Sequence, residues 1–137
     1  MEIHVVAGVL YDQHGRLLIA QRPAGKVLAG RWEFPGGKVA DGEGAQQALV
    51  RELREELGLE VVGATRLMYY AVRYPDRTVW LDVWVVTQWH GIAEGLDGQA
   101  LAWVAPLNLP EHDILEADLP IVAALMSPSR EAIGGFI

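Results

Sequence analysis

The chain has 137 residues, of which 51% are apolar, and its formal net charge is −7. This length and composition suit one folded domain with a core of its own, and they exclude a disordered chain. With 11 basic against 18 acidic residues, the chain is a poor candidate for binding polymeric nucleic acid, because such binding depends on basic side chains that neutralise phosphates.

The absence of cysteine excludes disulfides, zinc–thiolate sites and a thiol nucleophile. The only serines, Ser127 and Ser129, lie at the C-terminal end, and the four histidines form no metal-binding motif. Catalysis, if present, therefore falls to carboxylates and a metal ion. No stretch is long and apolar enough to span a membrane, and the N-terminus does not resemble a secretory signal. We therefore expect a cytoplasmic protein.

In chain order, residues 3–11 and 17–21 are β-rich runs around a turn at 12–15, which predicts a hairpin. A helix is predicted over 44–57. Residues 67–74 and 78–89 predict a second, longer hairpin closed at 75–77. A short strand at 99–104 and a helix at 118–126 follow. These elements predict a single domain, residues 1–126, with the α/β sandwich fold class and a mixed central sheet. Residues 127–137 are predicted to be a loose tail.

The predicted helix 44–57 has an apolar stripe. It lacks proline and is rich in good helix formers. Leu49, Leu53 and Leu57 recur every four residues, so they form a stripe that must face a core. Gly58 follows the last leucine, where a left-handed C-terminal cap is usual.

The same helix carries an acidic face formed by Glu52, Glu55 and Glu56. Like charges at this spacing destabilise a helix by roughly 0.2–0.5 kcal/mol per pair. One interpretation is a solvated face with ion pairs such as Arg51–Glu55. The preceding Pro-Gly-Gly loop favours another, because paired glycines let backbone approach a ligand. Converging carboxylate and carbonyl oxygens suit Mg²⁺ or Mn²⁺ shared with substrate phosphates.

A motif of nine residues runs through this loop and helix. Its members are Gly37, Glu43, Arg51, Glu52, Leu53, Glu55, Glu56, Gly58 and Leu59. The pattern resembles the Nudix hydrolase signature G-x5-E-x7-R-E-U-x-E-E-x-G-U, where U is a bulky aliphatic residue, and every specified position matches. Matches at 21–23, 32–38, 76–77 and 117–120 follow in the family's order. The chain is most similar to the MutT-type branch, which cleaves nucleoside triphosphates to monophosphate and pyrophosphate. The resemblance implies an α/β/α sandwich.

The resemblance implies roles for individual residues. The metal ligands it implies, for Mg²⁺ or alternatively Mn²⁺, are the Gly36 carbonyl, Glu52, Glu55, Glu56 and Asp97. Glu52 is the favoured catalytic base, with Glu55 as the other candidate. The implied substrate-binding residues are Arg22, Glu33, Phe34, Pro35, Gly36, Arg77 and Asp118. The residues expected to be structural are Gly37, Glu43, Arg51 and Gly58.

Four of these roles have ordinary alternatives. Arg22 is expected to reach the phosphates, because its guanidinium fork suits their oxygens, but it could also be a surface arginine. Phe34 packs against the nucleobase by resemblance, or is plain core. Arg77 covers base or sugar, or is a solvated turn residue. Asp97 adds a carboxylate from outside the motif, or only makes a good turn.

Asp118 departs from the MutT-type pattern, which often has Asn here. The amide of Asn both donates and accepts against an oxidised guanine, whereas an ionised Asp only accepts. A related branch, acting on CTP and on modified deoxycytidine and purine triphosphates, has Asp at this position. Its Gln-Ala-Leu-x-Trp run is also similar to residues 99–103.

The sequence therefore predicts a Mg²⁺-dependent hydrolase of modified nucleoside triphosphates that cleanses the nucleotide pool, with 8-oxo-dGTP as the leading substrate. The close alternative is a CTP or modified-dCTP pyrophosphohydrolase. Further alternatives are another substrate built on a nucleoside diphosphate, such as a nucleotide sugar, and a non-catalytic nucleotide sensor. The expected partner is a small nucleoside triphosphate rather than nucleic acid or membrane, and the protein is expected to be a monomer or homodimer.

Overall fold

The computed structural model describes residues 1–126, so the predicted tail at 127–137 lies outside the described residues. The strands are β1 (Glu2–Val9), β2 (Leu17–Gln21), β3 (Trp32–Glu33), β4 (Gly36–Lys38), β5 (Glu60–Arg73), β6 (Thr78–His90) and β7 (Ala100–Val104). The helices are α1 (Ala45–Leu57) and α2 (Leu119–Met126), with 3-10 turns η1 (Pro106–Glu111) and η2 (Glu116–Asp118). None of these helices is long and apolar enough to span a membrane.

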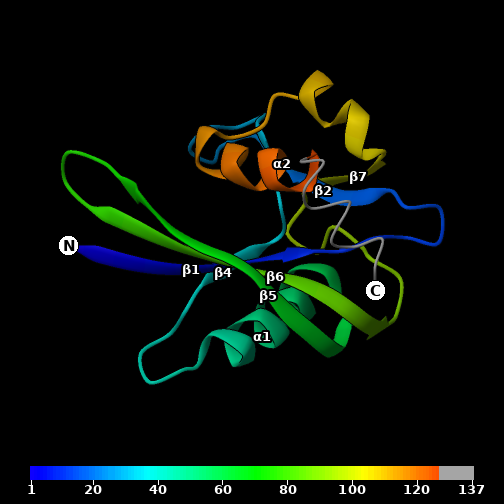
Figure 1. Cartoon of the computed structure of the whole chain (residues 1–137), viewed down its shortest axis with the longest axis horizontal. Coiled ribbons are helices and arrows are strands. Elements are labelled where there is room, and N and C mark those ends of the chain that lie inside the picture. Colours follow the sequence, from blue (N-terminus) through cyan, green and yellow to red (C-terminus); the bar gives the residue numbers. More distant parts are fainter. Residues whose placement is uncertain (127–137) are drawn as a thin grey trace.

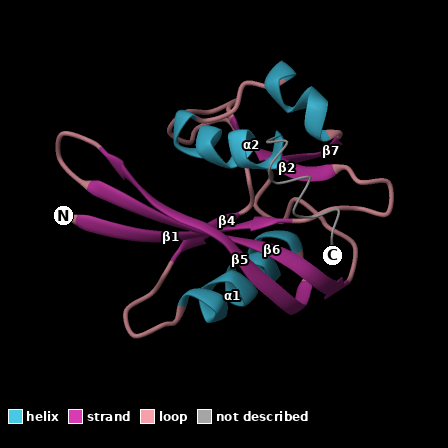
Figure 2. Ribbon diagram, in the orientation of Figure 1, coloured by secondary structure: helices cyan, strands magenta, loops and turns pink. Residues whose placement is uncertain are grey.

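The central sheet has the order β4-β1-β6-β5, in which β1 and β6 are parallel and the other pairs antiparallel. Helix α1 covers one face, while α2 and a smaller antiparallel sheet, β3-β2-β7, lie on the other side (Figures 1 and 2). The predicted sandwich with a mixed sheet is therefore confirmed. The long hairpin of β5 and β6 extends beyond the helices (Figure 1).

The predicted first hairpin is correct only at its closed end. There the Asp12 N–H donates to the Arg16 carbonyl at 2.9 Å, and Leu18 N–H donates to the Leu10 carbonyl at 3.2 Å. Beyond that point β1 joins the central sheet and β2 joins the smaller one. The second half of β1 and nearly all of β2 are buried. Each strand lies inside a sheet, β1 between β4 and β6 and β2 between β3 and β7, which a two-stranded hairpin does not provide.

The remaining predicted elements differ mainly at their ends. Strand β5 begins at Glu60 rather than 67, because irregularities in its pairing with β6 around Gly63 break the alternation that would have revealed it. Helix α1 starts after Gly44 and ends at Gly58, whose φ of 72° is the left-handed cap predicted for it. Helix α2 begins at Leu119, after the 3-10 turn that contains Asp118.

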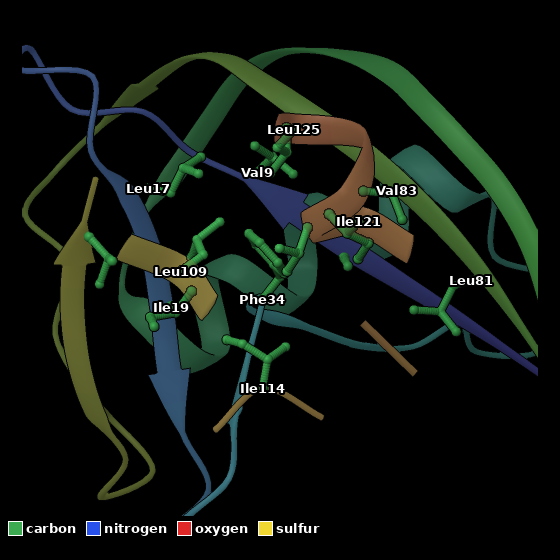
Figure 3. Packing of buried hydrophobic residues seen from close by; sticks show 13 residues of the cluster. Val9, Leu17, Ile19, Phe34, Leu81, Val83, Leu109, Ile114, Ile121 and Leu125 are labelled. Carbon is green, nitrogen blue, oxygen red and sulfur yellow. The ribbon is translucent and has the colours of Figure 1, made fainter. Parts of the chain in front are cut away.

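Two apolar cores hold the layers together. The lower core lies between α1 and the central sheet, where the predicted stripe of Leu49, Leu53 and Leu57 is fully buried. The upper core lies between the sheet, β2 and α2, and Figure 3 shows Phe34 in its middle, near Ile121. Since each fully buried aliphatic side chain contributes about 1.5–3 kcal/mol, these cores fix the loops that carry the functional residues.

Candidate active site

Arg51 joins the helix to the loop before it. Its Nε and Nη2 donate to the Glu43 carboxylate at 2.8 and 2.9 Å, and Nη2 also donates to the Lys38 carbonyl at 3.0 Å. Its Nη1 donates to Glu52 at 2.9 Å and to Glu55 at 3.1 Å. The hydrogen bonds from Arg51 hold the pKa of Glu43 at about 2, far below its usual range. The structural roles predicted for Arg51 and Glu43 fit these contacts.

The two glycines of the loop are required by different neighbours. A Cβ on Gly36 would lie 1.9 Å from the Val6 carbonyl oxygen, so only glycine lets β4 lie this close to β1. A Cβ on Gly37 would lie 2.3 Å from the carboxylate of Glu52. Because Gly37 has no side chain, it leaves room for the carboxylate of Glu52, which is the predicted catalytic base.

Gly36 presents backbone groups to the site. The Gly8 N–H donates to the Pro35 carbonyl at 2.8 Å. The hydrogen bonds between β1 and β4 are therefore made by the residues on either side of the Ala7–Gly36 pair and not by that pair itself. In an antiparallel ladder this directs the N–H and carbonyl of Gly36 away from β1. A backbone hydrogen bond from Gly36 reaches Glu56 and tends to lower its pKa.

The loop after β6 brings Asp97 to the end of α1. The N–H groups of Glu94 and Leu96 donate to the carbonyls of Leu57 and Glu56, both at 3.1 Å. The Gln99 side chain donates to the same Glu56 carbonyl at 3.1 Å. The last carbonyls of a helix have no partner within it, and here they hold the loop in place. Asp97 and Glu56 consequently line one cavity of about 150 Å³.

This cavity gathers charged groups. Its lining includes six predicted site residues, Arg22, Glu33, Pro35, Gly36, Glu56 and Asp97, together with Lys26 and Gln99. Burial, together with the negative charges of Glu52, Glu33 and Asp97, raises the pKa of Glu56 to about 8. Within residues 1–126 a backbone hydrogen bond from Gly36 opposes this rise, and no basic side chain does.

The carboxylates fit a divalent cation in their chemistry. Within residues 1–126, as the side chains stand, no three acidic or histidine groups lie close enough together to hold an ion. Glu52 and Glu55 are instead bonded to Arg51, and the Glu55 side chain is 59% exposed. Mg²⁺ nevertheless binds hard oxygen donors, and neighbouring carboxylates that raise one another's pKa are such donors. Glu52, Glu56, Asp97 and the Gly36 carbonyl would hold it.

A second cavity, of about 310 Å³, lies beside the first. Its lining includes Arg22, Glu33, Phe34, Gly36, Gly37, Lys38, Glu56, Leu81 and Asp118. The two cavities share Arg22, Glu33, Gly36 and Glu56. A ligand that extends from one into the other would thus have a charged end near Glu56 and a less polar end near Phe34.

Asp118 lies at the less polar end and is almost fully buried. The Phe34 N–H donates to its Oδ2 at 2.9 Å, and within residues 1–126 no hydrogen bond reaches Oδ1. Burial raises the pKa of Asp118 to about 7, although the Phe34 hydrogen bond works against that shift. The group therefore changes between acceptor and donor near neutral pH.

Arg22 connects the charged end to Glu33. Its Nη1 donates to the two Glu33 oxygens at 3.3 and 3.2 Å, and its Nε donates to the Val27 carbonyl at 2.7 Å. Burial raises the pKa of Glu33, while Arg22 opposes that rise. Both side chains are about 30% exposed, so the guanidinium is accessible to a ligand phosphate.

Arg77 is not brought to either cavity. It lies at the end of the β5–β6 hairpin, where its guanidinium stacks on Tyr74 at 4.6 Å and pairs with Asp76. Its predicted contact with base or sugar stays a prediction. Phe34 is 3% exposed in the upper core and also lines the second cavity, and its predicted contact with the nucleobase stays a prediction.

Sequence reasoning missed several lining residues. Lys26 and Gln99 line the first cavity, and Leu81 the second. Leu81 follows the alternation of β6 and could have been assigned to the same face as Ala7 had the parallel β1–β6 register been known. Lys26 lies in an irregular loop, where neither periodicity nor a motif gives a signal.

Comparison with known proteins agrees with this geometry. The NUDIX domain matches residues 1–125, so the chain belongs to the Nudix hydrolase family, whose members generally need a divalent metal ion. The chain is 40% identical over 125 residues to a CTP pyrophosphohydrolase of Escherichia coli K12, covering 91% of this chain and 92% of that protein. It is 47% identical over 88 residues to an 8-oxo-dGTP diphosphatase of Proteus vulgaris, covering 64% and 79%.

A solved structure has the same fold. It comes from work on the MutT proteins of Aliivibrio salmonicida and Vibrio cholerae, with a TM-score of 0.81 and 35% identity. The match covers 92% of this chain and 98% of that one. The protein is a Nudix hydrolase of the MutT type.

Proposed function

We propose that this enzyme hydrolyses modified nucleoside triphosphates to monophosphate and pyrophosphate, with 8-oxo-dGTP as the leading substrate. The observation that carries the proposal is a pair of cavities that share four lining residues. The first is lined by carboxylates and cations, and the second adds Phe34, Leu81 and Asp118. A nucleoside triphosphate also has two unlike ends, a charged triphosphate and a base. The triphosphate suits the first cavity and the base suits the second.

At the charged end, the chain positions the phosphates and a water molecule. Arg22 and Lys26 supply positive charge to the phosphate oxygens. Glu52 accepts the proton of the water as its oxygen bonds to phosphorus and the bridging anhydride P–O bond breaks. Bound Mg²⁺ would neutralise charge that develops on the phosphates. Arg51 and Gly37 hold the Glu52 carboxylate in place for this role.

At the other end, Asp118 recognises the base. With a pKa raised to about 7, the neutral form offers a donor and an acceptor, as the amide of Asn does. This supports the oxidised purine despite the departure from Asn. The ionised form only accepts, which suits the amino group of cytosine, adenine or guanine and is therefore compatible with the alternative CTP substrate. The E. coli relative that acts on CTP makes this second candidate a specific one.

The test is pyrophosphate release from a panel of triphosphates with Mg²⁺ and with EDTA. The panel sets 8-oxo-dGTP beside dGTP, CTP, dCTP, 5-methyl-dCTP and 2-hydroxy-dATP. We expect Mg²⁺-dependent release that is fastest for 8-oxo-dGTP. Preference for the cytidine compounds would move the enzyme to the alternative, and no release from any of them would contradict the proposal.

The base is tested separately with Glu52→Gln. This variant should lose most turnover but remain folded and still bind nucleotide, because only the proton acceptor is removed. Near-normal turnover would exclude Glu52 and direct attention to Glu55.

A further inference from the structure

The position of Asp118 depends on contacts from distant parts of the chain. The residue ends a 3-10 turn of three residues, Glu116–Asp118, and such a short turn has little stability of its own. A buried carboxylate that recognises a base must nevertheless be held within a fraction of an ångström. Tertiary hydrogen bonds must therefore supply the rigidity.

Tyr70 supplies one of these bonds. Its hydroxyl donates to the Ala117 carbonyl at 2.6 Å. That carbonyl belongs to the same peptide group as the Asp118 N–H, which donates to the Leu115 carbonyl at 2.9 Å. The peptide group before Asp118 is thus held on both sides, by β5 and by its own turn.

The side chain of Asp118, which follows this peptide group, is held at one of its two carboxylate oxygens. The Phe34 N–H donates to Oδ2, so Oδ1 is the atom left to face a base. Rotation of the 117–118 peptide group would turn the carboxylate about its bond to Phe34 and displace Oδ1. The Tyr70 hydroxyl opposes that rotation.

We propose that Tyr70 is a positioning residue for base recognition, which acts on the substrate through the Ala117 carbonyl and Asp118. The inference rests on the proposed function, because it gives Tyr70 the role of orienting the carboxylate that recognises the base. Tyr70 does not line the second cavity. It pairs with Leu81, which does, and its ring packs against the upper core.

The hydroxyl can be removed without disturbing this packing. Tyr70→Phe keeps the ring against the upper core and deletes only the donor to Ala117. The matched control is Tyr69→Phe on the same strand. The Tyr69 ring is 50% exposed and stacks on Trp80, and its hydroxyl makes no hydrogen bond within residues 1–126.

The experiment compares kcat/KM for the preferred nucleoside triphosphate with kcat/KM for 2-deoxyribose 5-triphosphate, which has the same phosphates but no base. A hydrogen bond of this kind is worth about 0.5–1.5 kcal/mol, so Tyr70→Phe should lower the ratio of the two values roughly two- to twelvefold. Turnover of the baseless substrate should be unchanged. Tyr69→Phe should leave both values at the wild-type level.

A double variant tests the route through Asp118. Asp118→Ala should lower the same ratio, and adding Tyr70→Phe to it should cause no further loss, because the group being positioned is gone. An equal loss on both substrates, or a Tyr70→Phe variant that behaves like Tyr69→Phe, would overturn the positioning role alone. If the wild type does not favour the base-bearing substrate, or if Asp118→Ala leaves the ratio unchanged, the proposed base recognition fails as well.

Discussion

Two carboxyl groups stand at opposite ends of the site, Glu56 half-buried and Asp118 almost fully buried, and their surroundings differ. Burial raises the pKa of both, to about 8 for Glu56 and to about 7 for Asp118. Around Glu56 three other carboxylates add to the rise, whereas around Asp118 only Glu33 does; in each case one backbone hydrogen bond, from Gly36 or from Phe34, opposes it. Like charges therefore contribute more to the raised pKa of Glu56 than to that of Asp118, whose shift comes chiefly from burial. Similar pKa values thus arise from two different surroundings.

The largest effect should come from removing the charge of Glu56. Glu56→Gln keeps the shape but takes away an anionic ligand, so activity with Mg²⁺ should fall about 10²- to 10³-fold. Turnover at saturating Mg²⁺ is the measurement. Activity within threefold of the wild type would show that Glu56 is no metal ligand.

Glu56→Gln, which should lower activity, should raise the stability of the metal-free protein at high pH. Between the unfolded pKa near 4.5 and the folded pKa near 8, the folded state holds a proton that the unfolded state has lost. The metal-free wild type should therefore lose stability as pH rises through this window, by about 1.4 kcal/mol for each pKa unit of difference. Glu56→Gln should lack this loss, and Mg²⁺ should reduce it in the wild type. Urea unfolding at pH 5.5, 7 and 8.5, with EDTA, measures it.

Two neighbouring glycines give a sharper comparison of fold and site. Gly36→Ala places a Cβ against the Val6 backbone, which cannot move aside, so it should cost about 3 kcal/mol or more of stability. Gly37→Ala meets only the end of the flexible Glu52 side chain. It should fold normally but lose activity about 10²-fold, because the base is displaced. Thermal unfolding and turnover on both variants separate the effects, and equal losses of stability would contradict this division.

The base end should respond to pH through Asp118. Below its pKa of about 7 the neutral group donates and accepts, and above it the ion only accepts. Raising the pH from 6 to 8 should therefore shift the preference from 8-oxo-dGTP towards CTP, by about three- to tenfold in the ratio of kcat/KM. Asp118→Asn, which does not titrate, should make this ratio independent of pH. A shift that persists in Asp118→Asn would assign it to another group.

The sequence predicted the charged end of the site better than the base end. The motif carries Glu52, Glu56 and Arg51 on one helix, where spacing alone places them, and Leu49 and Leu53 fix which face is buried. These relations are local and follow from 3.6 residues per turn.

The base end combines segments that lie far apart in the chain. Asp118 bonds to Phe34, and Tyr70 bonds to Ala117, across separations of 84 and 47 residues. Such contacts depend on which strands share a sheet, and the division of the first hairpin between two sheets was not predicted. The Arg51–Glu43 bond was predictable because the motif brings both within one loop and helix.

The smallest effect is expected at Arg77, the predicted substrate residue farthest from the cavities. It is solvent-accessible and already paired with Asp76 and Tyr74. Exposed contacts of this kind are worth about 0.5–1 kcal/mol, so Arg77→Ala should raise KM roughly two- to fivefold with kcat unchanged. Arg54→Ala, which removes the surface ion pair between Arg54 of α1 and Glu60 of β5, is the control and should leave KM unaltered. If Arg77→Ala instead lowers kcat/KM more than tenfold, the β5–β6 hairpin must bend onto the bound nucleotide, and the base end would then include a moving element as well as the fixed carboxylate of Asp118.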